Sequence, residues 1–140
     1  MNKWYECRVK YLQIDQEGYE RNVTETRLVE AVSYTDAESS IYEIMKEITR
    51  HDFHIVGIKQ SNITEVIPGA GEFQYKAKVT TVSLDDNGKK IISYCLAAAS
   101  DIIDAYGKFT ELFSTQLTVF KLDSISETNI IETYNLLSSE

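Results

Sequence analysis

The amino-acid sequence predicts an α+β fold built from a duplicated ββαβ unit, with antiparallel sheets, one helix per repeat and a pseudo-twofold relation between the repeats. The first indication is a pattern that occurs twice. Residues 28–48 read as the end of a strand, a capped helix start and an amphipathic helix, and residues 96–113 read the same way. The copies align without a gap at an offset of 68 positions (105 − 37), which places Ala37 on Ala105.

The second indication is a β-hairpin at the start of each repeat. Residues 3–14 and 73–84 alternate between apolar and polar side chains, which is typical of half-buried strands. Each is followed by a turn and a return strand, over residues 23–31 and 91–99. The second turn contains Asn87-Gly88, a pair that tolerates the positive φ angles of a type I′ turn.

Each predicted helix begins at a residue that can cap it, Ser33 in the first repeat and Asp101 in the second. Their side-chain oxygens can accept hydrogen bonds from the free N–H groups of the first turn. Apolar residues then recur at helical spacing, which predicts the buried face of each helix. This face comprises Ala37, Ile41, Ile44, Met45 and Ile48 in the first repeat and Ala105, Phe109, Leu112 and Phe113 in the second.

A third strand is predicted after each helix. In the first repeat it runs from Phe53 to about Ile67, and in the second it begins at Leu117. Matching Phe53 with Leu117 gives an offset of 64 (117 − 53), so the second helix is expected to be shorter by about one turn. Because the third strand runs parallel to the second, it can pair with the first, which gives the spatial order 2-1-3.

The length of the chain limits the number of domains that it can form. One repeat is too small to bury both its helix face and its sheet face well, whereas two copies sharing a core can do so. We therefore expect one domain over residues 1–140, made of repeats 3–67 and 73–131. Hydrophobic residues make up 43% of the chain, which indicates a globular protein.

Charge and cysteine content exclude several classes of protein. The net charge is −8, which opposes non-specific binding to duplex nucleic acid. No apolar run approaches the roughly 20 residues of a membrane-spanning helix. The first residues have no apolar signal-peptide region, and two cysteines make no disulfide framework. We therefore expect a cytoplasmic protein without a membrane partner.

Four segments resemble a known family. They are WYECRVKY at residues 4–11, LVEAVSYTDAE at 28–38, IKQSNITEV at 58–66 and YKAKV at 75–79. The chain is similar in these segments to an uncharacterised family of Bacteroidetes and their phages, which is described only as a domain of unknown function. The resemblance implies no activity and no catalytic residue. It implies a protein encoded by a phage or another mobile element, located in the host cell cytoplasm if phage-encoded.

The strongest metal-like pattern is the pair His51 and His54, which flanks Asp52. A structural zinc ion needs about four N, S or O ligands, and both cysteines lie far away in sequence. The alternative is a helix C-terminus, where an imidazole meets free carbonyl groups. We expect no metal and no cofactor.

Candidates for catalysis have structural explanations. Asp36 and Asp104 are equivalent, but each lies in a first helical turn, where a carboxylate is favoured by capping and by the helix dipole. Cys7 and Cys95 lie in strand patterns without a local histidine or basic cluster that would form a thiolate. We therefore predict no catalytic residue and no enzymatic activity.

Basic residues concentrate in the two hairpins, which contain nine of the 14 lysines and arginines. A basic, aromatic sheet face can bind single-stranded nucleic acid through stacking and phosphate contacts. A solvated face or a subunit interface is the alternative. The candidate interaction face comprises Trp4, Arg8, Lys10, Phe73, Lys76 and Lys78.

The return strand of the second repeat has no charge between residues 91 and 99. A bare strand edge exposes unpaired N–H and C=O groups, and proteins pair, cover or charge such edges. We predict that Ser93, Tyr94 and Cys95 are buried, either inside the monomer or at a homodimer interface, and we favour the dimer.

Two functions remain. The leading prediction is a non-enzymatic interaction or regulatory protein of a phage or mobile element, working through a sheet face or edge, with a protein partner and a homodimeric state. The alternative is an accessory protein that binds single-stranded nucleic acid through the basic and aromatic hairpin strands.

Overall fold

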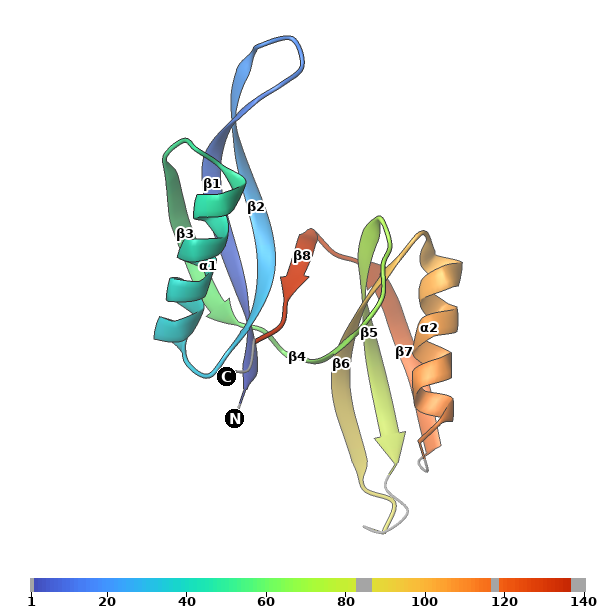
Figure 1. Ribbon diagram of the computed structural model, residues 1–140. Coiled ribbons are helices and arrows are strands. Elements are labelled where there is room, and N and C mark those ends of the chain that lie inside the picture. The colour runs from blue at the N-terminus through green and yellow to red at the C-terminus, as the bar shows by residue number, and fades with distance from the viewer. Residues whose placement is uncertain (1, 83–86, 117–118, 137–140) are drawn as a thin grey trace. The chain divides into compact units, whose positions relative to one another are not determined.

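The computed structural model describes residues 2–82, 87–116 and 119–136. Over these residues the chain forms two helices and eight strands in two sheets, so the α+β prediction is confirmed (Figure 1). The strands are β1 (Lys3–Ile14), β2 (Glu20–Ala31), β3 (Phe53–Gln60), β4 (Ile63–Ile67), β5 (Phe73–Val82), β6 (Lys90–Ala99), β7 (Val119–Glu127) and β8 (Ile130–Tyr134), and the helices are α1 (Tyr34–Ile48) and α2 (Ile102–Ser114).

The chain divides into two compact units. Unit 1 comprises Met1–Ser61 and Asn129–Glu140, and unit 2 comprises Asn62–Thr128. The sheet of unit 1 has the order β3-β1-β2-β8, and that of unit 2 has the order β4-β6-β5-β7. Within each sheet, the three strands from one repeat have the predicted order 2-1-3.

The fourth strand of each sheet comes from the other repeat. β4 follows β3 along the chain but pairs in parallel with β6, and β8 follows β7 but pairs in parallel with β2. The prediction of one uninterrupted strand from Phe53 to about Ile67 is therefore wrong, because the chain leaves the first sheet after Gln60. The compact units thus divide the chain differently from the sequence repeats 3–67 and 73–131.

Equivalent hydrogen bonds hold the two points where the chain leaves a sheet. The backbone N–H of Ser61 donates to the carbonyl of Trp4, and the N–H of Thr128 donates to the carbonyl of Gln74, each over 2.8 Å. Each bond ties the end of the third strand to the start of the first strand of the same repeat. The chain therefore leaves the first sheet after β3 and the second sheet after β7 through the same type of backbone contact.

The third strands match at an offset of 67, and the predicted offset of 64 is wrong. Ile58 pairs with Cys7 while Ile125 pairs with Ala77, and the difference between the two isoleucines is 67 (125 − 58). Apolar residues follow Leu117 and Phe120 with the same spacing, so the pattern alone could not choose between them. The helices have 15 and 13 residues and do not differ by a full turn. Leu117 lies outside the described residues.

Each helix is capped as predicted and covers one face of its sheet (Figure 1). The Ser33 Oγ accepts a hydrogen bond from the Asp36 N–H, and the Asp101 carboxylate accepts one from the Asp104 N–H. In the second hairpin, Asn87 and Gly88 have positive φ angles of 55° and 76°, as expected. The preceding residues 83–86 lie outside the described part of the chain.

Each unit has its own buried cluster beneath its helix. Ile41 and Met45 in unit 1 and Phe109 and Phe113 in unit 2 are buried, as the helical spacing predicted. Ile48 is 43% exposed, so its predicted burial is wrong. It is the last residue of α1, and the fully buried residues of that helix end one turn earlier at Met45.

Unit 1 also contains a charged network on the helix side of its sheet. Arg27 is 7% exposed, and its guanidinium donates to the Glu25 carboxylate over 3.1 Å and to the Tyr134 hydroxyl over 3.2 Å. The Tyr11 hydroxyl donates to the same carboxylate over 2.7 Å. Pairing is required because a buried charge without a partner is costly. Since Tyr134 lies on β8, the network ties the exchanged strand to β2.

We predict that Ile41→Ala and Phe109→Ala each lower the free energy of unfolding by about 2–5 kcal/mol, because each leaves a cavity in a fully buried cluster. Urea unfolding followed by circular dichroism measures the change. Val56→Ala, at a residue that is 49% exposed, is the control and should cost below about 0.5 kcal/mol. Equal small losses for all three variants would contradict the assignment of these cores.

Candidate interaction surfaces

A hollow of about 490 Å³ lies where β1 continues past the start of β3. The pairing of these strands ends where Tyr11 meets Phe53, so the end of β1 has no β3 neighbour. The turn between α1 and β3 borders the opening. The lining residues are Lys10, Tyr11, Leu12, Asn22, His51, Asp52 and His54.

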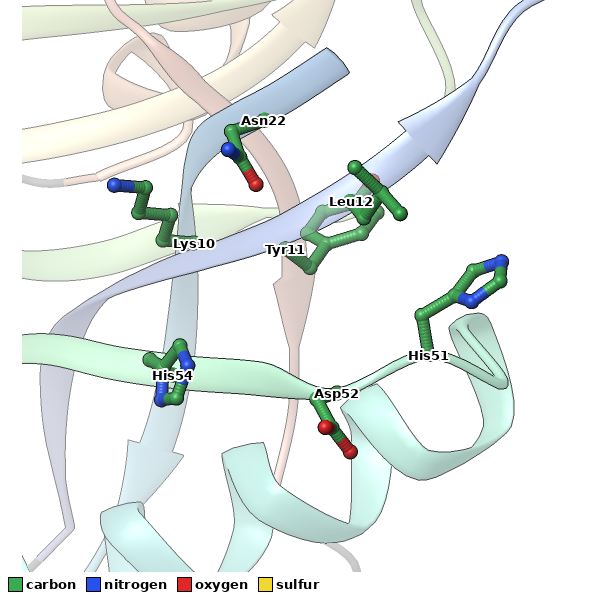
Figure 2. Close-up of a pocket in the computed structure, with 7 residues that line it drawn as sticks. All are labelled: Lys10, Tyr11, Leu12, Asn22, His51, Asp52 and His54. Atoms are coloured by element: carbon green, nitrogen blue, oxygen red, sulfur yellow. The ribbon is translucent and has the colours of Figure 1, made fainter. Parts of the chain in front are cut away.

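The two histidines do not converge in this hollow. Figure 2 shows His51 and His54 at opposite ends, with the Asp52 side chain directed away from both. Both imidazoles are exposed. Within residues 2–82, 87–116 and 119–136, no group of three or more His, Cys, Asp or Glu side chains is placed to hold a metal ion.

Basic side chains of unit 1 gather on the sheet face away from α1. Cys7 and Val9 belong to the buried cluster under the helix, so the alternating residues Arg8 and Lys10 point to the opposite face. Lys10 lies directly across from His54 on β3, and all three basic side chains are exposed. The structure therefore brings together Arg8 and Lys10 as predicted and adds His54.

The equivalent face of unit 2 is also basic. Lys76 and Lys78 are half-buried, and the Lys76 ammonium lies 4.9 Å from the centroid of the Tyr94 ring. Thr80 pairs with Lys121, which is the counterpart of His54 at the offset of 67 (121 − 54). A basic residue, His54 or Lys121, thus occupies the same place on the third strand of each repeat.

The two predicted aromatic members of the interaction face need correction. Trp4 is only 7% exposed and offers little surface for stacking. Phe73 pairs with Ala99, a member of the buried cluster under α2, so it lies on the opposite sheet face from Lys76 and Lys78. The reason is the two-residue alternation of a strand, which separates odd from even positions.

The uncharged strand β6 is covered over only part of its length. β4 pairs with it from Tyr94 to Ala97, and Cys95 is 2% exposed. Ser93 and Tyr94 are half-buried, so the predicted burial holds fully for Cys95 alone. In the described part of the chain β4 does not reach the start of β6, where Ile91 and Ile92 are 48% and 56% exposed.

The acidic candidates for catalysis, Asp36 and Asp104, lie in the first turns of the two helices. The Asp104 carboxylate accepts hydrogen bonds from the backbone N–H of Ser100 over 3.0 Å and from its hydroxyl over 3.3 Å. The backbone bond, followed by the nearby charge of Lys108, lowers the pKa of Asp104. Its twin Asp36 takes the same position at the start of α1. The Asp104 contacts match the capping role that the sequence predicted, and Asp36 has the predicted place in the first turn.

The sequence did not indicate a groove that lies between α1 and β8 in unit 1. Since β8 comes from the other repeat, pattern matching within one repeat could not place it beside α1. The signal in the sequence that could have indicated a neighbour for β2 was Arg27. Its charge lies on the side of β2 where Val29 and Ala31 are buried.

The two cysteines provide a test of the non-catalytic assignment. Burial raises the pKa of Cys7 to about 12 and that of Cys95 to about 11. Because the thiolate is the reactive form, we predict that neither reacts with Ellman's reagent in the folded protein at mildly alkaline pH. Both should react at once in denaturant, which is the control. Rapid reaction of either native thiol would contradict its burial.

The comparisons with known proteins point to one family. The described part of the chain contains no helix long and apolar enough to cross a membrane. No curated protein and no solved structure matches the sequence. A family model described as a domain of unknown function (DUF4494) matches residues 3–136. This match covers nearly the whole chain, which therefore belongs to the DUF4494 family.

Proposed function

We propose that this chain is a non-catalytic interaction protein that forms a homodimer through the open half of β6. The observation that carries the proposal is the apolar strand edge at the start of β6, where Ile91 and Ile92 are about half exposed. The buried thiols and the capping role of Asp104 support a role without catalysis. The resemblance to phage sequences supports an origin in a phage or mobile element and action in the host cytoplasm.

The geometry of the open edge suits pairing with a second copy. β5 occupies one side of residues Lys90 to Ser93, and β4 pairs with β6 only from Tyr94 onward. Two identical edges that meet antiparallel form a closed twofold interface, in which each copy satisfies the other's backbone groups. Successive side chains alternate between the faces, so Ile91 and Ile92 would cover both sides of the new pairing.

The corresponding edge of unit 1 explains why only one edge would be used. β8 pairs with β2 from Thr26 to Val29, which leaves the start of β2 uncovered in the same way. That segment carries Glu20, Arg21 and Glu25, and charges are a common protection against edge pairing. The dimer is therefore expected to use β6 and not β2.

Ile92→Lys tests the dimer, because it places two like charges close together across the twofold axis while the monomer fold stays intact. Thr24→Lys is the matched control at the equivalent position of β2 (92 − 24 = 68). We expect sedimentation equilibrium to give a dimer mass for the wild type and Thr24→Lys, and a monomer mass for Ile92→Lys. A wild type that stays monomeric at high concentration would refute the proposed association.

A second candidate function, binding of single-stranded nucleic acid, is favoured by the separation of charge within unit 1. Asp36, Glu43 and Glu47 lie exposed on α1, whereas Arg8 and Lys10 lie on the opposite face of the sheet. A local basic face can contact phosphates even on a chain of net charge −8. With Trp4 buried and Phe73 on the other face, such binding would depend on phosphate contacts more than on stacking.

Anisotropy of a fluorescein-labelled oligothymidylate at two salt concentrations tests this second function. Lys10→Glu is expected to weaken binding about tenfold at low salt, because it reverses a charge on the basic face. Lys46→Glu makes the same change of charge on α1 and should have little effect. No binding by the wild type at low salt, or equal losses in both variants, would exclude this site.

A further inference from the structure

The end of β1 forms an open strand edge in unit 1. β1 pairs with β2 along its whole length, but its pairing with β3 stops where Tyr11 meets Phe53. Among residues 2–82, 87–116 and 119–136, no third strand pairs with β1. Residues 12–14 therefore have a strand neighbour on one side only, and their other side is open to a further strand.

Two residues direct their backbone groups out from this open edge. The Trp4 carbonyl accepts a hydrogen bond from Ser61, which follows β3, so Trp4 directs its N–H and C=O groups to the β3 side. In an antiparallel sheet this direction alternates from residue to residue. Because the pairing of β1 with β2 is unbroken, Leu12 and Ile14 direct their groups to the same side as Trp4. Within the described residues, no strand pairs with these donors and acceptors.

Two hollows border the open edge. The first, of about 490 Å³, includes Lys10 and His54, which share the sheet face away from α1. The second, of about 480 Å³, includes Ile48 and Arg50 at the end of α1. Ile48 is 43% exposed, so this hollow has uncovered apolar surface. Since side chains of a strand alternate between its faces, an added strand would meet basic groups on one face and Ile48 on the other.

The charges around the edge favour an acidic occupant. Lys10, Arg50, His51 and His54 are exposed and line the hollows, whereas the acidic residues of the hairpin turn line neither. Figure 2 shows the carboxylate of Asp52 directed away from both histidines. In the part of the chain that the structure describes, no ion pair involves Lys10 or Arg50. These cations can therefore pair with carboxylates of a partner.

Unit 2 covers the corresponding edge one residue farther. There β7 pairs with β5 as far as Val82, which is the counterpart of Leu12 at the offset of 70 (82 − 12). The partner of Val82 is Val119, and its counterpart in unit 1 is Asp52 (119 − 67), which lies in the turn before β3. The open edge at Leu12 is therefore a feature of unit 1.

We propose that the open edge of β1 binds an extended acidic segment of a partner protein, in which aspartate or glutamate alternates with apolar residues. The backbone of the segment pairs with Leu12 and Ile14 as an added strand. Its carboxylates meet Lys10 and His54, and its apolar side chains cover Ile48. The open backbone groups favour a peptide over a nucleic acid, which has no strand backbone to pair with them. The proposal rests on the interaction role of the chain but not on pairing through β6.

The probe is a fluorescein-labelled peptide in which glutamate alternates with valine, titrated with the full-length chain and followed by anisotropy. A peptide with lysine in place of glutamate is the control for charge. The glutamate peptide with methylated backbone nitrogens is the control for strand pairing, because methylation removes its N–H donors. We expect only the unmethylated glutamate peptide to bind, since both its charge and its backbone are needed.

A pair of variants and a spectroscopic readout locate the binding. Lys10→Glu should weaken binding about tenfold, a loss equal to about 1.4 kcal/mol, because it reverses a charge beside the edge. Lys46→Glu makes the same change on α1, outside both hollows, and should leave binding unchanged. In the wild type, peptide-induced amide shifts should centre on residues 12–14. Sedimentation of Lys10→Glu should still give the mass of the wild type, which separates failure of this edge from failure of the dimer.

Several outcomes would overturn the proposal. They are no binding of the glutamate peptide at millimolar concentration, equal binding of its methylated form, equal losses for Lys10→Glu and Lys46→Glu, and shifts centred outside residues 12–14. Binding of an oligothymidylate by a chain that does not bind the glutamate peptide would assign the basic face to nucleic acid and would equally reject a peptide.

Discussion

The structure depends on the backbone hydrogen bonds of two inner strands, β2 and β6. Each belongs to a three-stranded sheet from its own repeat, and each would be an edge if the repeat folded alone. A parallel strand from the other repeat completes each sheet, β8 beside β2 and β4 beside β6. The uncharged middle of β6 can exist because this exchange satisfies its N–H and C=O groups. Neither sheet is complete with residues of one repeat alone.

Much of the fold could be predicted from the sequence because local rules govern it. Ser33 and Asp101 cap their helices, and the spacing of Ile41 and Phe109 identified the buried helix faces. Hairpins and helices are patterns of neighbouring residues, so duplication made them visible twice. The order 2-1-3 followed from the direction of the strands alone.

The exchange of strands could not be predicted because it is a choice between two equivalent partners. β4 has the same alternation whether it continues β3 or joins β6, and no local pattern distinguishes these pairings. The interaction face was predicted wrongly for a different reason, the two-residue alternation of a strand. Phe73 was grouped with Lys76 by proximity in sequence, although the strand places them on opposite faces. The groove beside Ser40 needs β8, which lies far away in the sequence.

The two repeats share one arrangement of strands and helix, but they differ in the side chains beside the exchanged strand. In unit 1, Arg27 with its partners fills the space where unit 2 has Cys95, and Ser40 stands where unit 2 has Lys108. Changes of this kind leave helix caps and strand registers untouched. They alter what each unit presents next to its fourth strand.

The division of the chain sets the order in which its parts can be completed on the ribosome. Unit 2 is one continuous stretch, whereas unit 1 needs residues from both ends of the sequence. The N-terminal unit therefore waits with the Thr26–Val29 edge of β2 uncovered until Ile130–Tyr134 have been synthesised, by which time unit 2 has every strand it needs. This reverses the usual order, in which N-terminal domains finish first. It also makes the newly made chain vulnerable to misassembly at β2, and the charges at the start of that strand are well placed to limit it.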